Sequence, residues 1–362
     1  MSSPSLRGRR LAPLLLALAL LVAAVRPAAA QGALAGVATR AEDGAPIAYA
    51  LVRVLRADPR AGAPAAPAGQ AITNANGRFH LGHLPAGDYR LQLARIGYEP
   101  VLSPALRVED GRTVQHELRG ASRALTLAAV TVRPDAGCVT LARIGDDARL
   151  ATLWQEARKG VETRLAFERQ FRYTRVAKQD GVVRYRLFRR GIHTVDTTRS
   201  EPDSVEARRR RRVADLRANG HKSADGRLTI PNEKDLLDED YMRDQCLEVA
   251  EADASAGAGA VGLRFRSVSP RADVVDVDGT LWLDGGTFLA RRLDVRWTRR
   301  GDPFGHASMS YDDVSVGGSP LRFPVGARAT LEPSALLAKA VVAGASSTIV
   351  IRYSGFEQVG AR

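Results

Sequence analysis

The feature that most limits the possible folds of this chain is a regular series of turn signals around short apolar runs. Residues 76–100 read NGRFHLGHLPAGDYRLQLARIGYEP, where Asn-Gly, Leu-Pro-Ala-Gly and Ile-Gly-Tyr separate stretches of alternating apolar and polar residues. Asn-Gly suits a turn with positive φ, and alternation with a period of two is typical of strands that bury one face. We therefore expect the chain to reverse direction about every ten residues, as it does in an antiparallel β-sandwich.

The predicted sandwich covers residues 32–120. The segment GQAITNANGRFHLGHL, residues 69–84, predicts a hairpin that turns at Asn76-Gly77. Strand alternation assigns one face of each strand to the interior. The residues expected in the core are Ile47, Ala50, Val52, Val54, Phe79, Leu81, Tyr89 and Leu91.

These motifs, in this order, resemble the carboxypeptidase regulatory-like domain. Asn-Gly-x-Phe, Leu-Pro-x-Gly-x-Tyr and Ile-Gly-Tyr carry the resemblance within residues 32–120. The resemblance implies a seven-stranded sandwich of the transthyretin-like or prealbumin-like type, which is grouped with carbohydrate-binding-like folds. It also implies an accessory module without catalytic residues. Carbohydrate binding would call for exposed stacking aromatics, and the candidates are Tyr49, Tyr89 and Tyr98, although alternation places Tyr89 inward.

The first 30 residues have the three parts of a secretory signal peptide. Three arginines at positions 7, 9 and 10 precede an apolar run at residues 11–25, and Ala28-x-Ala30 precedes Gln31. The run is shorter than the roughly 20 residues that a membrane-spanning helix needs, and no later window of the sequence is long and apolar enough to span a membrane. We expect an exported protein, periplasmic or secreted, from which residues 1–30 are removed. The alternative is that these residues stay attached as an uncleaved anchor.

A linker at residues 121–145 is expected to separate the sandwich from a second domain at residues 146–362. The second domain opens with an apolar stripe at helical spacing, which predicts one long helix capped by Asp146 or Asp147. The stripe consists of Leu150, Leu153, Trp154, Ala157, Val161 and Leu165.

After this helix the apolar period changes from 3.6 to 2, which predicts a series of antiparallel strands. Asp180-Gly181 is interpreted as a hairpin turn between two of them. GTLWLDGGTFLARRLDVRW, residues 279–297, resembles the hairpins of lipoprotein-sorting half-barrels, which implies a curved sheet that could carry an apolar ligand. The predicted fold class is mainly β: a transthyretin-like β-sandwich, followed by an α+β domain with a curved antiparallel sheet and one long helix.

Cys138 and Cys246 are the two cysteines of the sequence. Two cysteines in an exported protein usually pair, because the compartment is oxidising. We therefore predict a disulfide that ties the interdomain linker to the second domain. The alternative is two buried, independent thiols.

Arginine dominates the basic residues. The formal charge of the chain is +13, and +9 remains once residues 1–30, with four arginines and no acidic residue, are removed. An unbroken run consists of Arg208, Arg209, Arg210, Arg211 and Arg212. Because guanidinium groups pair with phosphate and carboxylate, the run predicts binding to envelope glycans or other anionic polymers. The alternative is a solvated, mobile or helical segment. Export makes a nucleic-acid partner unexpected, and no protein partner can be identified.

The motifs that could support chemistry lack their structural context. His80 and His83 are spaced so that strand alternation sends them to opposite faces, unless Gly82 bulges the strand. GAGAVG at residues 257–262 is followed by a strand-like run, whereas a nucleotide site requires a helix there. We therefore predict a protein that is not an enzyme, holds no cofactor, and binds or scaffolds components of a bacterial cell envelope. The alternatives are carbohydrate binding through the sandwich and transport of an apolar ligand.

Overall fold

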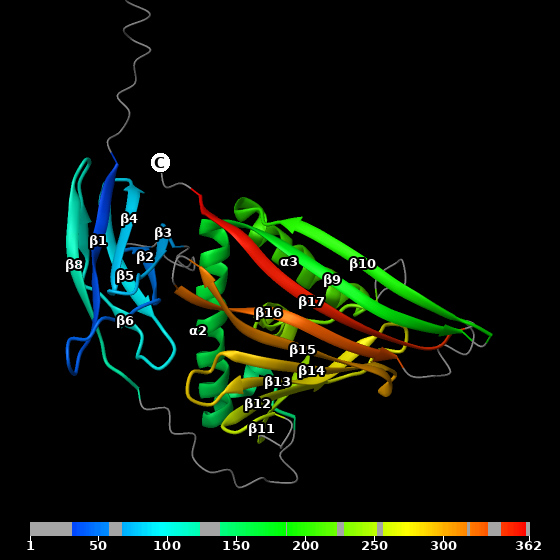
Figure 1. The fold of residues 1–362 in the computed structure, drawn as a ribbon. Helices are drawn as coiled ribbons and strands as arrows, with labels where there is room; N and C mark the ends of the chain where they lie inside the picture. The colour runs from blue at the N-terminus through cyan, green and yellow to red at the C-terminus, as the bar shows by residue number, and fades with distance from the viewer. Residues whose placement is uncertain are drawn as a thin grey trace, which may run out of the picture.

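The computed structural model describes residues 31–57, 67–123, 138–185, 187–222, 228–251, 256–316, 319–331 and 342–359. The predicted signal peptide and residues 124–137 of the predicted linker lie outside these ranges. Figure 1 shows three layers: a small β-sandwich, a helical layer around one long helix, and a large sheet of long strands. The mainly β class with one long helix is confirmed.

The sandwich consists of two sheets that pack face to face. In the first, β1 lies between β4, which is antiparallel to it, and β8, which is parallel. In the second, β2 lies between β3 and β5, and β6 and β7 pair with different parts of β5. The bounds are β1 (Gly32–Arg40), β2 (Leu51–Arg56), β3 (Gly69–Ile72), β4 (Arg78–Leu84), β5 (Gly87–Ala94), β6 (Val101–Leu102), β7 (Leu106–Val108) and β8 (Thr113–Gly120).

All eight predicted core residues of the sandwich are buried. The hairpin predicted over residues 69–84 is wrong, because β3 pairs with β2 whereas β4 pairs with β1. The turn at Asn76-Gly77 exists, and Gly77 has a φ of +70°. It carries the chain from one sheet to the other, and the buried Thr73 hydroxyl holds the crossing by donating to the Ile47 carbonyl at 2.7 Å.

The predicted helix is α2 (Ala148–Gln170), and the Asp147 carboxylate caps it by accepting from the Leu150 amide at 2.9 Å. The apolar stripe faces inward as expected, with Leu165 half-buried and the other five members buried. The stripe packs on one face of the large sheet and shares a core with Leu281, Leu293 and Trp297. The sandwich lies on the other side of α2 (Figure 1).

The large sheet has nine strands in the described residues, in the spatial order β10-β9-β17-β16-β15-β14-β13-β12-β11, and all neighbours are antiparallel. The hairpin predicted over residues 279–297 is confirmed as the pair β13 and β14. The bounds are β9 (Phe171–Tyr185), β10 (Arg189–Arg199), β11 (Gln245–Glu251), β12 (Ala260–Ser267), β13 (Asp276–Asp284), β14 (Ala290–Arg299), β15 (Asp302–Val316), β16 (Ser319–Leu331) and β17 (Val342–Gln358).

The turn predicted at Asp180-Gly181 is wrong, because both residues lie inside the long strand β9. Gly181 is opposite Ser347 of β17, and a Cβ atom at this position would lie 2.7 Å from the Ser346 carbonyl oxygen. The glycine therefore permits close approach of two strands. The chain reverses instead between Tyr185 and Arg189.

Short helices connect β10 to β11 and lie beside α2. The helical segments other than α2 are η1 (Leu141–Asp146), η2 (Pro202–Ser204), α3 (Val205–Asn219), α4 (Glu233–Leu236) and α5 (Glu239–Met242). No helix within the described ranges is long and apolar enough to cross a membrane.

The predicted disulfide between Cys138 and Cys246 is confirmed. The two Cα atoms lie 5.0 Å apart, and 108 positions separate the cysteines in the sequence. Next to the disulfide, the Leu247 amide donates to the Val139 carbonyl at 2.8 Å. The segment before η1 is therefore fastened to β11 at the edge of the large sheet.

Candidate functional site

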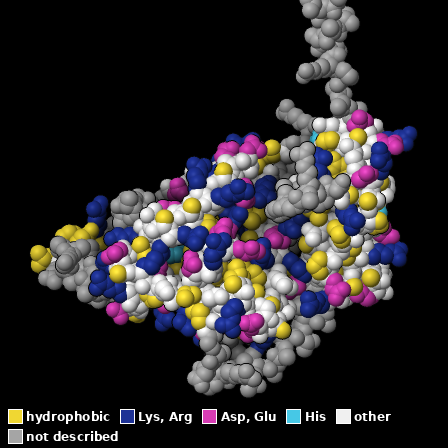
Figure 2. All heavy atoms as spheres, turned by 180° about the vertical axis from the view of Figure 1, so that it is seen from behind, with side chains coloured by type: hydrophobic (Ala, Val, Ile, Leu, Met, Phe, Trp, Pro, Cys, Tyr) yellow, Lys and Arg dark blue, Asp and Glu magenta, His cyan; other side chains and the backbone are white. Residues whose placement is uncertain are grey.

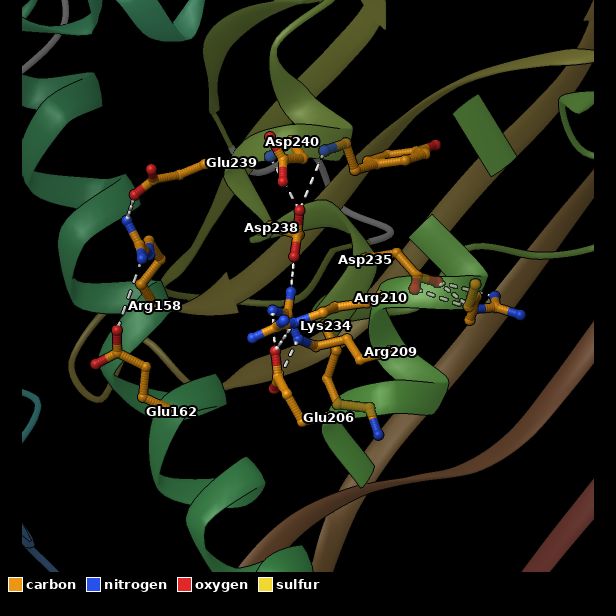
Figure 3. A network of polar contacts seen from close by, with 12 residues as sticks. Arg158, Glu162, Glu206, Arg209, Arg210, Lys234, Asp235, Asp238, Glu239 and Asp240 are labelled. Carbon is orange, nitrogen blue, oxygen red and sulfur yellow. Dashed lines mark hydrogen bonds and ion pairs between the residues drawn. The ribbon is translucent and has the colours of Figure 1, made fainter. Parts of the chain in front are cut away.

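A cleft of about 710 Å³ lies between the sandwich and the helices. Arg53 and Gln92 of the sandwich line one wall, and α2, α3 and α5 supply the others. Figure 3 shows that charged side chains from the three helices point toward one another across this space. The cleft is therefore built for polar contacts.

Glu162 and Arg158 of α2 connect the walls of the cleft. The carboxylate of Glu162 forms an ion pair with Arg53 of the sandwich at 2.8 Å. Arg158, one helix turn away, lies 3.7 Å from the same carboxylate. Arg158 also pairs with Glu239 of α5 (Figure 3). One chain of charges thus runs from the sandwich through α2 to α5.

A second group of charges surrounds Glu206 at the start of α3. Arg169 of α2 and Arg209 each lie 2.8 Å from its carboxylate, and Arg210 lies 3.0 Å away. Hydrogen bonds from Arg209 and Arg210 outweigh the opposing effect of partial burial and lower the pKa of Glu206 to about 2. This carboxylate stays ionised at neutral pH, so it cannot serve as a proton donor there.

The predicted arginine run lies on α3, where several of its members have acidic partners. Arg209 pairs with Asp238 as well as Glu206, and the guanidinium of Arg212 holds Asp235 with contacts of 2.8 and 2.9 Å. The side chains of Arg208 and Arg211 donate to backbone carbonyl oxygens nearby. Binding of an anionic polymer to this run stays a prediction.

Behind the cleft, a buried ionic cluster joins α2 to α4. Lys234 contacts the two carboxylate oxygens of Glu168 at 2.9 and 3.1 Å, and Arg164 contacts the same carboxylate at 3.1 Å and also pairs with Glu233. Burial alone would raise the pKa of Glu168, but Lys234 and Arg164 lower it to about 2. The cluster is charge-paired and fixes the helices in place.

A small pocket of about 30 Å³ lies between α2 and the large sheet. The Tyr311 hydroxyl and one Glu233 oxygen line this space without a hydrogen-bond partner among the described residues.

The two histidines and the three tyrosines considered in the sequence lie on the sandwich and do not form a site. His80 and His83 are both exposed, and His83 has a φ of +59° that breaks the strand alternation. Tyr89 is fully buried, and its hydroxyl donates to the Pro85 carbonyl at 2.8 Å. Tyr49 and Tyr98 are half-buried, and Tyr98 packs against the sandwich core.

Comparison with known proteins identifies the first part of the chain. Residues 33–119 match the family model of the carboxypeptidase regulatory-like domain. This match confirms the resemblance seen in the sequence for the sandwich. A search of curated proteins found no match. The likeness of the second part to lipoprotein-sorting half-barrels stays a prediction.

Several solved structures are similar to part of the chain at low overall similarity. The minor pilin of Streptococcus agalactiae is 18% identical over 29% of this chain and 49% of its own, with a TM-score of 0.21. A putative carbohydrate binding protein from Pseudomonas aeruginosa is 18% identical over 27% of this chain and 93% of its own, with a TM-score of 0.19. The 5-hydroxyisourate hydrolase of Klebsiella pneumoniae is 17% identical over 25% and 87%, with a TM-score of 0.18. The chain spans less than half the length of the first of these.

Proposed function

We propose that this chain is an exported, non-catalytic protein that binds or scaffolds components of a bacterial cell envelope. The observation that carries the proposal is that acidic side chains of the cleft are paired with arginines. Glu206, Asp238 and Glu239 are each held by at least one arginine, and hydrogen bonds from Arg209 and Arg210 lower the pKa of Glu206 to about 2. A catalytic cleft more often presents groups whose pKa values are shifted toward the working pH.

Two further features support binding over transformation of a ligand. The sandwich matches a domain whose family resemblance implies an accessory role. The long helix α2 contacts this sandwich on one side and the large sheet on the other, so the two β units are presented as one body. A domain held in this way is suited to fix a ligand or a neighbouring component in a defined position.

Export is the part of the proposal that rests on the sequence alone. The leader pattern at residues 1–30 predicts it, and the disulfide fits an oxidising compartment. For the ligand we favour envelope glycans or other anionic polymers, because the chain beyond the leader keeps a charge of +9.

Binding without turnover can be tested with isolated envelope polymers. Purified protein is incubated with peptidoglycan or with an acidic polysaccharide, and the pellet and the supernatant are analysed by mass spectrometry. We expect the protein to sediment with the polymer and to release no fragments. Soluble fragments that disappear in the variant Glu239→Gln would overturn the proposal, because that result would give a cleft carboxylate a catalytic role. The matched control is Glu109→Gln, which changes an exposed carboxylate of the sandwich that does not line the cleft.

A further inference from the structure

The hairpin that joins β9 and β10 ends in an apolar tip flanked by arginines. We define the hairpin tip as Arg184, Tyr185, Leu187, Phe188, Arg189 and Arg190. The Tyr185 amide donates to the Phe188 carbonyl at 2.8 Å, and the two aromatic rings stack with their centroids 4.4 Å apart. The backbone hydrogen bond and the ring pair thus hold Tyr185 and Phe188 side by side at the end of the hairpin.

The apolar side chains of this tip face solvent. Leu187 is 92% exposed and Phe188 is 57% exposed. Among the described residues, no other two neighbouring large apolar residues are both exposed. Single exposed apolar residues are common on protein surfaces. An exposed leucine beside an exposed phenylalanine at the end of a hairpin instead indicates a surface that contacts an apolar partner.

The position of the tip makes it accessible. Figure 1 shows that β9 and β10 run away from α2 and the sandwich, so their turn lies at the far end of the sheet. In the reverse view of Figure 2, hydrophobic side chains form this end of the molecule, with Lys and Arg side chains beside them. Within the described residues, every residue of β10 except Ile192 is exposed.

Positive charge surrounds the apolar pair. Arg184 and Arg189 face each other across the hairpin, Arg190 follows, and all three are exposed. Unlike Arg209, Arg210 and Arg212 of α3, they form no ion pair with a described acidic residue. Lys178 and Arg352 are exposed as well but lie farther along β9 and β17, and the exposed Asp180 lies between Lys178 and the tip.

We propose that the hairpin tip binds an anionic lipid bilayer by placing Leu187 and Phe188 among the lipid headgroups while the flanking arginines contact phosphates. Apolar side chains next to arginines are the combination that partitions into a membrane interface, where both lipid chains and phosphate groups are available. An acidic polysaccharide would satisfy the arginines but would leave the two apolar side chains in water. The bilayer is therefore the partner that uses the whole tip.

Binding of this kind is weak and reversible, because two apolar side chains do not anchor a protein by themselves. Each arginine near an anionic surface strengthens binding by about fivefold, as an interaction of about 1 kcal/mol does. The attraction is screened by salt, because the Debye length falls from about 30 Å at 0.01 M to about 8 Å at 0.15 M.

Vesicle flotation tests this proposal directly. The chain beginning at Gln31 contains every described residue and lacks the apolar leader, which would itself bind lipid. We expect it to float with vesicles of phosphatidylcholine containing about 30% phosphatidylglycerol, an anionic content comparable to that of natural surfaces. Binding to pure phosphatidylcholine vesicles should be much weaker, and inorganic phosphate should not compete at matched ionic strength.

Matched variants separate the tip from the rest of the surface. Leu187→Ser with Phe188→Ser should weaken binding at least about tenfold, whereas Leu102→Ser, at an exposed leucine of the sandwich, should not change it. Arg184→Gln with Arg189→Gln should weaken binding, and Arg78→Gln with Arg90→Gln, at exposed arginines of the sandwich, should not. Equal binding of the tip variants and their controls would overturn the proposal.

A second readout reports insertion itself. The three tryptophans of the chain are buried, so Phe188→Trp adds an exposed fluorophore at the tip. Its emission should shift to shorter wavelength when anionic vesicles are added. An unchanged emission, or a protein that binds an acidic polysaccharide and no vesicle, would contradict membrane binding without touching the proposed non-catalytic role.

Discussion

At the scale of single residues, burial changes the chemistry of His221. The side chain is 3% exposed, and its two ring nitrogens lie 3.1 Å from the Thr229 carbonyl and 2.9 Å from the Tyr241 hydroxyl. Burial lowers the pKa of His221 to about 4, an effect that Asp235 and Asp276 only partly oppose. The imidazole is therefore neutral in the folded protein at pH 7, and it accepts from one neighbour while it donates to the other.

We predict that this histidine makes stability depend on pH below neutrality. The unfolded chain binds a proton at His221 below about pH 6.5, whereas the folded protein does not until about pH 4. The free energy of unfolding should therefore fall as the pH falls, by about 2 kcal/mol between pH 6.5 and pH 5. Urea unfolding across this range should show a smaller loss for His221→Gln. His193→Gln, at an exposed histidine, should retain the loss seen in the parent chain.

Phe79 tests the core of the sandwich at the same scale. Its side chain is 5% exposed and packs in a cluster with Leu34, Leu81 and Leu118. Replacing Phe79 with Ala should lower the free energy of unfolding by about 3–5 kcal/mol, because it removes a buried ring and leaves a cavity. His80→Ala, at the exposed neighbouring position, is the control. A loss below about 1 kcal/mol for Phe79→Ala would show that this cluster is not the core.

At the scale of elements, α2 is the piece that joins the two β units. Glu156, which is 1% exposed, accepts from the Gly97 amide of the sandwich at 3.2 Å. It also contacts Lys159 at 2.7 Å, and Lys159 donates in turn to the Tyr98 carbonyl at 2.9 Å. These contacts bind one helix turn to the loop between β5 and β6.

Breaking this contact should loosen the sandwich from the helix. Glu156→Ala leaves the buried Lys159 ammonium without its carboxylate, so we expect a loss of about 3–5 kcal/mol in the free energy of unfolding. Amide exchange at Gly97 should accelerate as well. Glu162→Ala removes a more exposed ion pair with the sandwich and should cost about 1 kcal/mol or less. Equal losses for the two variants would show that Glu156 has no special role in the junction.

Two kinds of element could be predicted from the sequence: a helix whose apolar repeat continues over several turns, and strands whose partners lie nearby in the chain. The apolar stripe of α2 repeats over several turns, and the sandwich motifs occur within about 90 residues, so both were predictable. Asp180-Gly181 was misread because a glycine also occurs where two strands approach closely. The exposure of Leu187 could not be seen in the sequence, because Val183, Tyr185 and Leu187 alternate with arginines as they would in a strand that buries one face.

The charged cleft could not be predicted for a different reason. The arginines of α3 find their partners at Asp235 and Asp238, and Arg53 of the sandwich meets Glu162 of α2, so the pairs join distant parts of the chain. A run of arginines looks equally basic whether or not folding brings carboxylates to it. Composition alone therefore overstated the free positive charge of this segment.

At the scale of the whole molecule, the disulfide closes a large part of the chain into one loop. In the chain-entropy description, a loop of 108 residues stabilises the folded state by about 4–5 kcal/mol. Replacing both cysteines with serine should lower the free energy of unfolding by up to that amount, and reduction of the parent protein should have the same effect. Denaturant unfolding of the oxidised, reduced and double-serine proteins measures it. Three coincident curves would show that the loop closure does not stabilise the fold.

As a whole, the molecule is proposed to be exported and to bind the cell envelope without transforming its components. The most direct measurement expresses the full chain in a bacterial host, separates cytoplasm, periplasm and membranes, and determines the intact mass of the protein in each. We predict the mass of residues 31–362 with Cys138 and Cys246 oxidised, recovered outside the cytoplasm and released from the membranes by added salt. An unprocessed chain with two free thiols in the cytoplasm would contradict the account.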